Sequence, residues 1–202
     1  MAKRTHPTKE RLIETMVSLM DERALHDIQV DDVLRESNIS KGSPYHHFEN
    51  FEELTEAALI NRFAASVDRS IELVAAAVNE AMNADEFVKA IIHVTTVTQG
   101  QDRAKFRLER ARVIGLSVNS PALLRLLEVE QDRLTAAMAD IVREGQEKGW
   151  VNKTFDAKTI AVFMQAYTLG RVIDDVASAK EHIESKDWND VVNASVKSLL
   201  SV

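Results

Sequence analysis

Apolar residues recur every three or four positions along most of this chain, which is the spacing of one face of a helix. The longest such stretch covers residues 52–82 and contains neither Gly nor Pro, so we expect one long helix there. A shorter stripe over 8–23, with Thr8 as its N-cap, predicts the first helix. Five more helices are expected, at about 85–98, 102–116, 121–148, 156–177 and 186–200.

Residues 28–48, IQVDDVLRESNISKGSPYHHF, combine a short amphipathic helix, a turn of three to four residues and a second short helix. Val30, Val33 and Leu34 lie at i, i+3 and i+4 and share one buried face. Asn38 tolerates the left-handed backbone of a sharp helix stop. Ser40 can cap the helix that follows, which carries small and hydrogen-bonding residues near its N-terminal end. A helix-turn-helix presents that end to the major groove, so the pattern predicts a DNA-reading module.

The run SKGSPYHHF, with an amphipathic helix before it and Phe51–Leu54 after it, resembles the TetR/AcrR family of bacterial transcriptional regulators. The strong match covers roughly the first quarter of the chain, and the remainder fits the family in length and helical pattern. The resemblance implies an all-helical homodimer in which effector binding shifts the spacing of two DNA-binding heads. We therefore expect an all-α fold of about nine helices, with a three-helix helix-turn-helix domain at 1–51 and a helical ligand-binding and dimerisation domain at 52–202.

The chain departs from the family pattern at four positions. Pro44 lies in the recognition helix, where the family usually carries Leu, Phe or another helix-friendly residue, and Phe51 stands where a Lys usually contacts phosphate. Ala24 and Asn38 replace the usual glycines. If Ser40 is the N-cap, Pro44 is the fourth helical residue and lacks the N–H that would close the first turn. If the cap lies three residues later, Pro44 falls at the first helical position, where proline is favoured.

We expect the DNA contacts to come from the first helix and the recognition helix. By resemblance, Thr8 and Lys9 grip phosphate, while Gly42 lets the backbone approach the DNA closely. Ser43 and Pro44 are the candidates for base edges. Phosphate contacts set register and salt dependence, whereas base contacts set sequence. The predicted DNA-binding residues are Thr8, Lys9, Ser40, Lys41, Gly42, Ser43, Pro44, Tyr45 and His46.

Composition excludes several other classes of protein. The chain has no cysteine, and it lacks the motifs of serine hydrolases, P-loop and dinucleotide enzymes and zinc proteases. Adjacent His46 and His47 point about 100° apart on a helix, and Asp174 and Asp175 are expected at a solvated helix end. We therefore expect no enzyme activity, no metal and no cofactor.

Charge and hydropathy agree with a regulator of this kind. The formal net charge is −7, but four of the first eleven residues are basic, and local charge decides phosphate contact. The basic N-terminal stretch lacks the apolar core of a signal peptide, and no run of about 18 apolar residues occurs. A cytoplasmic protein without membrane contact is expected.

Residues 156–177 carry apolar side chains on nearly every face, so this helix needs cover on two sides. A second copy of the chain can cover one of them; the alternative is a central helix buried within a monomer. The last helix, 186–200, has complementary spacing, and a four-helix interface from two such pairs obeys two-fold symmetry. The predicted dimer contacts are Phe163, Ala166, Tyr167, Gly170, Ile173, Val192, Val196 and Leu199.

Polar residues embedded in the apolar runs of the body are candidate contacts for a small-molecule effector. His93 lies in AIIHVTTV and is alternatively a hydrogen-bonded core residue. An inward Arg107 or Arg110 would indicate an anionic effector, because a buried Arg needs a counter-charge. The alternative pairs these arginines with Glu109 or Glu130 at the surface. The predicted ligand-binding residues are His93, Thr96, Arg107, Arg110 and Tyr167.

These expectations combine into a homodimeric transcriptional regulator, a repressor that releases a palindromic DNA operator when a small molecule binds the body. The long helix at 52–82 is the expected lever, since it starts beside the DNA reader and ends within the body. The alternative is a helical dimeric interaction protein of the same fold that has lost DNA binding. Pro44 and Phe51 are the residues that favour this alternative, and DNA binding at moderate salt separates the two.

Overall fold

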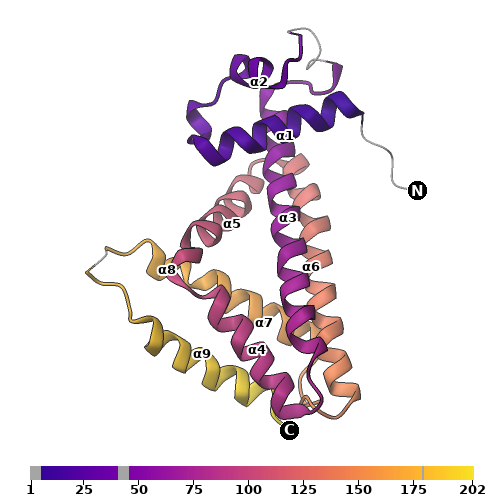
Figure 1. The fold of residues 1–202 in the computed structure, drawn as a ribbon, viewed down its shortest axis with the longest axis vertical. Coiled ribbons are helices and arrows are strands. Elements are labelled where there is room, and N and C mark those ends of the chain that lie inside the picture. Colours follow the sequence, from indigo (N-terminus) through magenta and orange to yellow (C-terminus); the bar gives the residue numbers. More distant parts are fainter. Residues whose placement is uncertain (1–5, 41–45, 179) are drawn as a thin grey trace.

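The computed structural model describes residues 6–40, 46–178 and 180–202, and every regular element within these residues is a helix. The predicted all-α fold is therefore confirmed for this part of the chain. Figure 1 shows a small helical head at one end of a long helix and a wider helical body around the remainder. Among the described residues, no helix is both long enough and apolar enough to cross a lipid bilayer.

The head contains α1 (Pro7–Glu22), the short 3-10 helix η1 (Leu25–Asp27) and α2 (Val30–Ser37), which pack on the first turns of α3 (Phe51–Asn79). Burial of about eight apolar side chains holds these elements together, each worth roughly 1.5–3 kcal/mol for the larger residues. They are Leu12, Met16, Leu19, Ile28, Val33, Phe48, Leu54 and Ala58. The last two belong to α3, so the long helix is part of both the head and the body.

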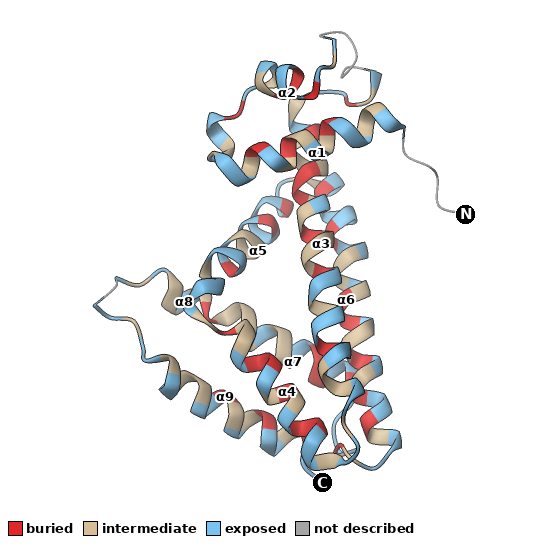
Figure 2. Ribbon diagram, viewed as in Figure 1, coloured by how far each residue is buried: buried red, intermediate tan, exposed pale blue. Residues whose placement is uncertain are grey.

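The body is built on α3 and α6, which pack side by side (Figure 1). One apolar cluster joins α3, α5 and α6 below the head, and a second joins α4, α6, α7 and α9 at the far end. Figure 2 shows that buried positions follow the inner faces of these helices. The body elements are α4 (Ala84–Thr98), η3 (Gln101–Arg103), α5 (Ala104–Ser117), α6 (Pro121–Glu147), α7 (Ala157–Gly170), α8 (Val172–Asp175) and α9 (Ser185–Leu200).

Short polar side chains begin four of the helices. Asn50, Asn83, Ser120 and Asp156 each accept a hydrogen bond from the backbone N–H three residues ahead. Each bond satisfies one of the free donors in a first helical turn. At the other end of α6, Gly149 has φ 73°, a left-handed conformation that glycine adopts without a Cβ clash.

Two predicted helices differ from the structure. The predicted cap at Thr8 is wrong, because the N-cap is His6, whose Nδ1 accepts a hydrogen bond from the Thr8 N–H at 3.2 Å. The predicted helix 156–177 is divided into α7 and α8 at Arg171. Gly170 weakens the helix there, and the Arg171 side chain is fully buried and donates to the Gln99 carbonyl oxygen.

Candidate functional site

Local hydrogen bonds hold α2 and the turn that ends it, which form the described part of the predicted helix-turn-helix. The Gln29 N–H donates to Asp32 Oδ2 at 3.0 Å and completes a capping box at the start of α2. This bond, with a second from Arg35 at 2.7 Å, lowers the pKa of Asp32 and keeps the carboxylate ionised. α2 ends at Asn38, the only described non-glycine residue with a positive φ, 54°. The left-handed turn predicted at Asn38 is confirmed.

Five of the nine predicted DNA-binding residues lie outside the described residues. They are Lys41, Gly42, Ser43, Pro44 and Tyr45, which we call the recognition segment. Ser40 and His46, on either side of that segment, are exposed. Thr8 is half-buried in the first turn of α1, and Lys9 places its Nζ 4.7 Å from the centroid of the Phe48 ring. The start of α1 therefore lies against the residues that follow the recognition segment.

A histidine pair strengthens this contact. The rings of His6 and His47 lie 4.7 Å apart with an interplanar angle of 35°. Burial of the His47 ring lowers its pKa, and the neighbouring basic groups His6, His46 and Lys9 lower it further. His47 therefore favours its neutral form, and Lys9 supplies the positive charge at this end of α1.

Three of the four departures from the family pattern have a structural explanation. Phe51 is the first residue of α3 and packs against the head core, so this position is occupied by an apolar contact within the head. Ala24 has φ −66°, a conformation that requires no glycine, and Asn38 adopts the left-handed turn itself. Pro44 lies outside the described residues.

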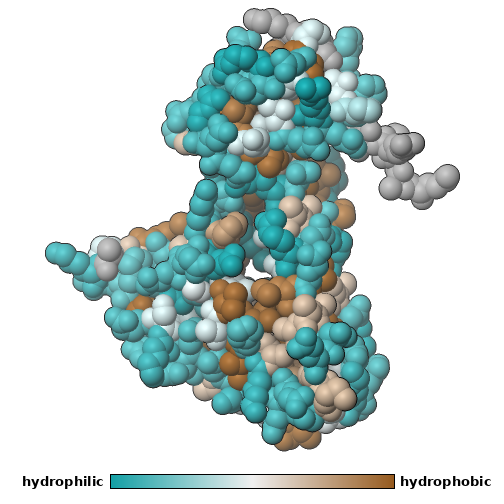
Figure 3. All heavy atoms as spheres, in the orientation of Figure 1, coloured by the Kyte–Doolittle hydropathy of each residue, from teal (hydrophilic) through white to brown (hydrophobic). Residues whose placement is uncertain are grey.

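A cleft of about 510 Å³ lies where the head meets the body. Its walls are the end of α1 with the loop that follows, the middle of α3, and α5; Leu134 of α6 closes it. Figure 3 shows the surface hollowed below the head, where hydrophobic residues meet hydrophilic ones. The volume lies within the range of about 300–1,000 Å³ that is typical of small-molecule sites.

The cleft has a basic lining, although the chain as a whole has a net charge of −7. Three acidic residues line it, against six basic ones: Arg23, Arg62, Arg69, Lys105, Arg110 and Arg112. Its larger apolar residues are Val17, Met20, Leu25, Leu59, Phe63, Val67, Phe106, Val113 and Leu134. The cleft thus combines a positive potential with an apolar wall.

Arg62 of α3 connects the head to the body across this cleft. Its Nη1 lies 3.0 Å from Asp21 Oδ1 at the end of α1, and its Nη2 donates to Glu109 Oε1 of α5 at 2.7 Å. The Arg62 side chain is 18% exposed, so this double ion pair is partly shielded from water. Any group that binds Arg62 from within the cleft competes with the contact between α1 and α5.

Arg110 is one of the residues with which α5 lines the cleft. Its Nη2 donates to Gln131 Oε1 of α6 at 2.8 Å and to Gln165 Oε1 of α7 at 3.1 Å, and its guanidinium lies 5.5 Å from the centroid of the Phe63 ring. Its Nε is buried and has no hydrogen-bond partner among the described residues. Burial lowers the pKa of Arg110, with no carboxylate to offset it.

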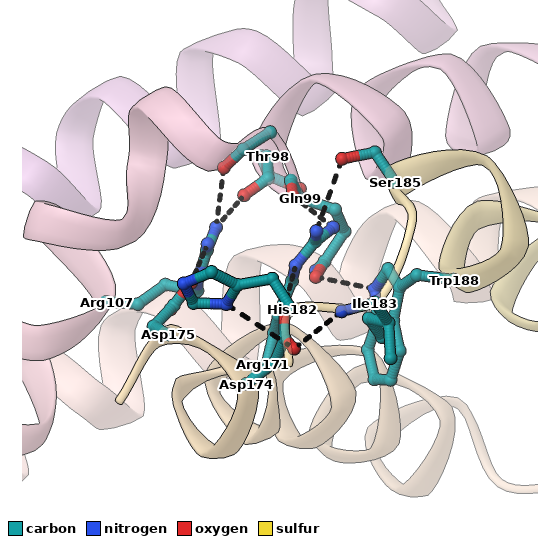
Figure 4. Close-up of polar contacts among 11 residues, drawn as sticks. Thr98, Gln99, Arg107, Arg171, Asp174, Asp175, His182, Ile183, Ser185 and Trp188 are labelled. Carbon is teal, nitrogen blue, oxygen red and sulfur yellow. Dashed lines mark hydrogen bonds and ion pairs between the residues drawn. The ribbon is translucent and has the colours of Figure 1, made fainter. Parts of the chain in front are cut away.

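Arg107 lies three residues earlier on the same helix and has a complete set of partners (Figure 4). Its Nε and Nη2 donate to the two carboxylate oxygens of Asp175 at 2.6 and 2.7 Å, and its Nη1 donates to the carbonyls of Thr98 and Gly100. The side chains of Arg107 and Asp175 are 5% and 4% exposed. The predicted surface pairing of Arg107 with Glu109 or Glu130 and the solvated helix end at Asp175 are both wrong.

A second buried arginine extends this network. Arg171 donates to the Gln99 carbonyl and to Ser185 Oγ, while the Trp188 indole N–H donates to Gln99 Oε1 at 3.0 Å (Figure 4). Burial and the neighbouring charge of Arg107 lower the pKa of Arg171. The network ties the end of α4 to the α7–α8 break and to the start of α9, which indicates a structural role.

The remaining predicted ligand contacts are not brought together. His93 and Thr96 are exposed on α4, and the Thr96 hydroxyl donates to the Ile92 carbonyl. Tyr167 lies within the body, where its hydroxyl shares a hydrogen bond of 3.0 Å with Thr95 Oγ1 and burial raises its pKa. Of the five predicted residues, Arg110 is the one that lines the cleft.

The predicted dimer contacts divide into two groups. Phe163, Ala166 and Ile173 are exposed, and Tyr167, Gly170 and Leu199 are half-buried. Val192 and Val196 are 4% and 1% exposed, because α9 turns them into the core of its own protomer. Assignment of these two valines to a contact with a second copy is therefore wrong.

Sequence reasoning missed Arg62 and its partner Asp21, which lies on a helix of the head. Arg62 lies between Ile60 and Phe63, two members of the apolar stripe of α3, and a position beside the stripe indicates a partly buried charge. Within the described residues, no group of three or more His, Cys, Asp or Glu side chains could hold a metal ion.

Comparison with known proteins places this geometry in a known fold. No family model matches the chain. The HTH-type transcriptional regulator UidR of Escherichia coli strain K12 is 21% identical over 86% of the chain and 84% of its own length. Among solved structures, a candidate TetR-family regulator from Mesorhizobium loti superposes with a TM-score of 0.69 at 13% identity, over 99% of this chain and 100% of that one.

A candidate transcriptional regulator from Saccharomonospora viridis, solved in complex with choline, superposes with a TM-score of 0.65 at 21% identity, over 96% of this chain and 97% of that one. Together these similarities show that the chain has the fold of TetR-family transcriptional regulators along nearly its whole length. The resemblance seen in the helix-turn-helix is thereby extended to the body.

Proposed function

We propose that this protein is a DNA-binding transcriptional regulator whose head binds a palindromic operator. The observation that carries this proposal is the turn at Asn38, which ends α2 and directs the chain into the recognition segment. Figure 1 places α1 and α2 at the end of the molecule away from the body, where they are free to approach a duplex. Exposed Ser40 and His46 flank the segment that the resemblance assigns to the major groove.

The regulator acts as a homodimer in this proposal. Apolar side chains are exposed on and beside α7, α8 and α9, including Ile173 at 78%, Val176 at 69% and Val191 at 64%. Cover by a second copy removes this surface from water and sets two heads on two half-sites about one DNA turn apart. Ile173→Asp is expected to shift sedimentation toward the monomer. Val129→Asp, at a position 64% exposed on α6, is the matched control.

The proposed regulation is repression relieved by a small molecule in the cleft. The cleft is crossed by the Arg62 ion pairs, so a bound molecule has direct access to the contact between head and body. A ligand shifts this equilibrium only if it prefers one head arrangement. The choline complex of the S. viridis regulator supports ligand binding in this fold. Choline is a cation, however, and the basic cleft here favours a ligand of another charge.

The proposed function is tested by selecting genomic DNA fragments with the purified full chain at about 150 mM salt. Enrichment of a palindrome with half-sites about one turn apart supports both the DNA reader and the dimer. The slope of affinity against salt then reports the number of phosphate contacts. Absence of enrichment from a folded, dimeric protein would favour an interaction protein of the same fold.

A further inference from the structure

The guanidinium of Arg110, at the cleft, has a buried hydrogen-bond donor without a partner among the described residues. It has five N–H donors, and the Nη2 pair is the part that is satisfied, by the amide oxygens of Gln131 and Gln165. Its Nε is buried without an acceptor, and the described residues provide no carboxylate for it. A cation withdrawn from water without a counter-charge is costly, and an incoming anion removes much of that cost.

The side chains around Arg110 are held in position by hydrogen bonds among themselves. Gln131, Gln165 and Thr135 form a closed ring of hydrogen bonds, with the Gln131 amide donating to Gln165 Oε1 at 2.8 Å. Both glutamine amides also donate to Thr135 Oγ1 at 3.1 Å. The ring fixes the two amide oxygens that hold Nη2, so the guanidinium is held in position before any ligand arrives.

We infer that the cleft binds an anionic molecule with an apolar body, whose acid group is recognised by Arg110. A guanidinium binds carboxylate, sulfonate and phosphate oxygens through paired, charge-assisted hydrogen bonds. The apolar body lies against the wall that includes Phe63, Val67 and Val113. This inference rests on the proposed function for its regulatory consequence, but the binding itself does not depend on DNA.

The exposed basic residues of the cleft lining add a second reason for an anion. Arg69, Lys105 and Arg112 line the cleft and are exposed, and no ion pair within the described ranges involves any of the three. Exposed basic residues around an opening raise the local concentration of anions and speed their entry. Arg62 differs, because Asp21 and Glu109 already neutralise it.

The test uses two fluorescent probes with the same ring system, 8-anilino-1-naphthalenesulfonate and the neutral N-phenyl-1-naphthylamine. The full wild-type chain is expected to bind the sulfonate more tightly than the amine. Arg110→Met is expected to weaken sulfonate binding about 10- to 100-fold, since a hydrogen bond to a charged group is lost in a shielded site. Binding of the neutral amine is expected to be unchanged.

Arg125→Met is the matched control, because Arg125 lies exposed on α6 and does not line the cleft. It is expected to change sulfonate affinity less than about three-fold, as a screened surface charge does. Arg110→Lys keeps the charge without the planar fork and is expected to retain part of the affinity. Melting curves of all variants show that each is folded. Equal sulfonate affinity in wild type and Arg110→Met, or no sulfonate binding by wild type, would overturn the inference.

The anion site and the proposed function fail in different ways. If the sulfonate binds through Arg110 but leaves operator affinity unchanged, the anion site stands and the ligand-controlled repression is wrong. If operator DNA is released by the neutral amine, and equally from wild type and Arg110→Met, the regulation stands and the anionic class is wrong. DNA affinity is measured by fluorescence anisotropy with each probe at saturation.

Discussion

Arg107 and Arg110 lie one turn apart on α5, and their hydrogen-bond partners differ. Arg107 is bound to both oxygens of Asp175 and to two backbone carbonyls, at the joint between α4, α5 and α8. Arg110 has two neutral amide oxygens and an unpaired Nε, at the cleft below the head. One arginine has a complete set of partners within its own chain, and the other has a buried donor without a partner among the described residues.

We interpret this difference as one between a polar group that stabilises the fold and one that is available to the proposed ligand. A buried pair such as Arg107 and Asp175 locks the geometry of a joint, because removal of either member leaves a charge without a partner. A buried charge without a partner lowers stability and persists where a ligand supplies the missing partner. At the far end of the body the buried charges are paired by its own side chains, whereas the end near the head has a cleft lined by an arginine with an unpaired donor.

The largest expected effect on stability comes from breaking the ion pair between Arg107 and Asp175. Arg107→Met leaves the Asp175 carboxylate, 4% exposed, without its partner and is expected to lower the free energy of unfolding by about 3–5 kcal/mol. Urea unfolding followed by circular dichroism measures the change. A loss below about 1 kcal/mol would mean that Asp175 reaches water easily and that the joint is not locked.

The matched control removes both charges. Arg107→Met combined with Asp175→Leu eliminates the buried carboxylate as well, so the double variant is expected to recover a large part of the lost stability. If the double variant is as unstable as the sum of the two single variants, the ion pair is not the reason for the loss, and packing at the joint is.

Substitution of Arg110 is expected to have a smaller effect on the free energy of unfolding. Arg110→Met removes two hydrogen bonds but also removes the cost of an uncompensated buried cation, so the free energy of unfolding is expected to change by less than about 1.5 kcal/mol. The same urea experiment, in the absence of any ligand, gives the value. A loss as large as that of Arg107→Met would show that Arg110 has a structural partner and would weaken the case for a ligand.

The contrast between these arginines was only half visible in the sequence. Apolar spacing predicts the helices because a helix that packs on one side repeats every 3.6 residues, and short polar residues such as Asn50 and Asp156 mark their starts. Both arginines lie in KFRLERARVI, where apolar and charged residues are mixed, so the sequence leaves open both an inward orientation and a surface pairing. Their partners were not, since Asp175 is 68 residues from Arg107 in the chain.

The errors have the same origin. A break at Arg171 depends on the Gln99 carbonyl of another helix, and helix propensity contains no information about that contact. The apolar face of α9 was assigned to a second copy, but Val192 and Val196 pack into the same protomer. Periodicity shows that a face needs cover and does not show which surface covers it. The cleft depends on the positions of α1, α3 and α5 together, and no local pattern encodes it.

Arg62 provides an intermediate case between the two arginines. It has two carboxylate partners, as a closed site does, but Asp21 is 64% exposed and Glu109 is 37% exposed. Asp21→Asn is therefore expected to lower stability by about 0.2–1 kcal/mol, the range of exposed ion pairs. A double-mutant cycle of Asp21→Asn with Arg62→Gln measures the coupling. Zero coupling would remove Arg62 as the connection between head and body.

The smallest expected effect extends the comparison to the head. There the surroundings of His47 disfavour the charged form of its ring. Its pKa is lowered from the usual value near 6.5 by burial and by nearby basic groups. As the pH falls below about 7, the unfolded chain takes up a proton at this ring before the folded head does, so the folded state loses stability.

His47→Gln is expected to reduce this part of the pH dependence of stability between pH 7 and 5. Melting curves measure the change. The control is His26→Gln, at an exposed position in η1. If both variants retain the full wild-type slope, then burial and the nearby basic groups do not favour the neutral ring of His47, and another group causes the loss of stability below pH 7.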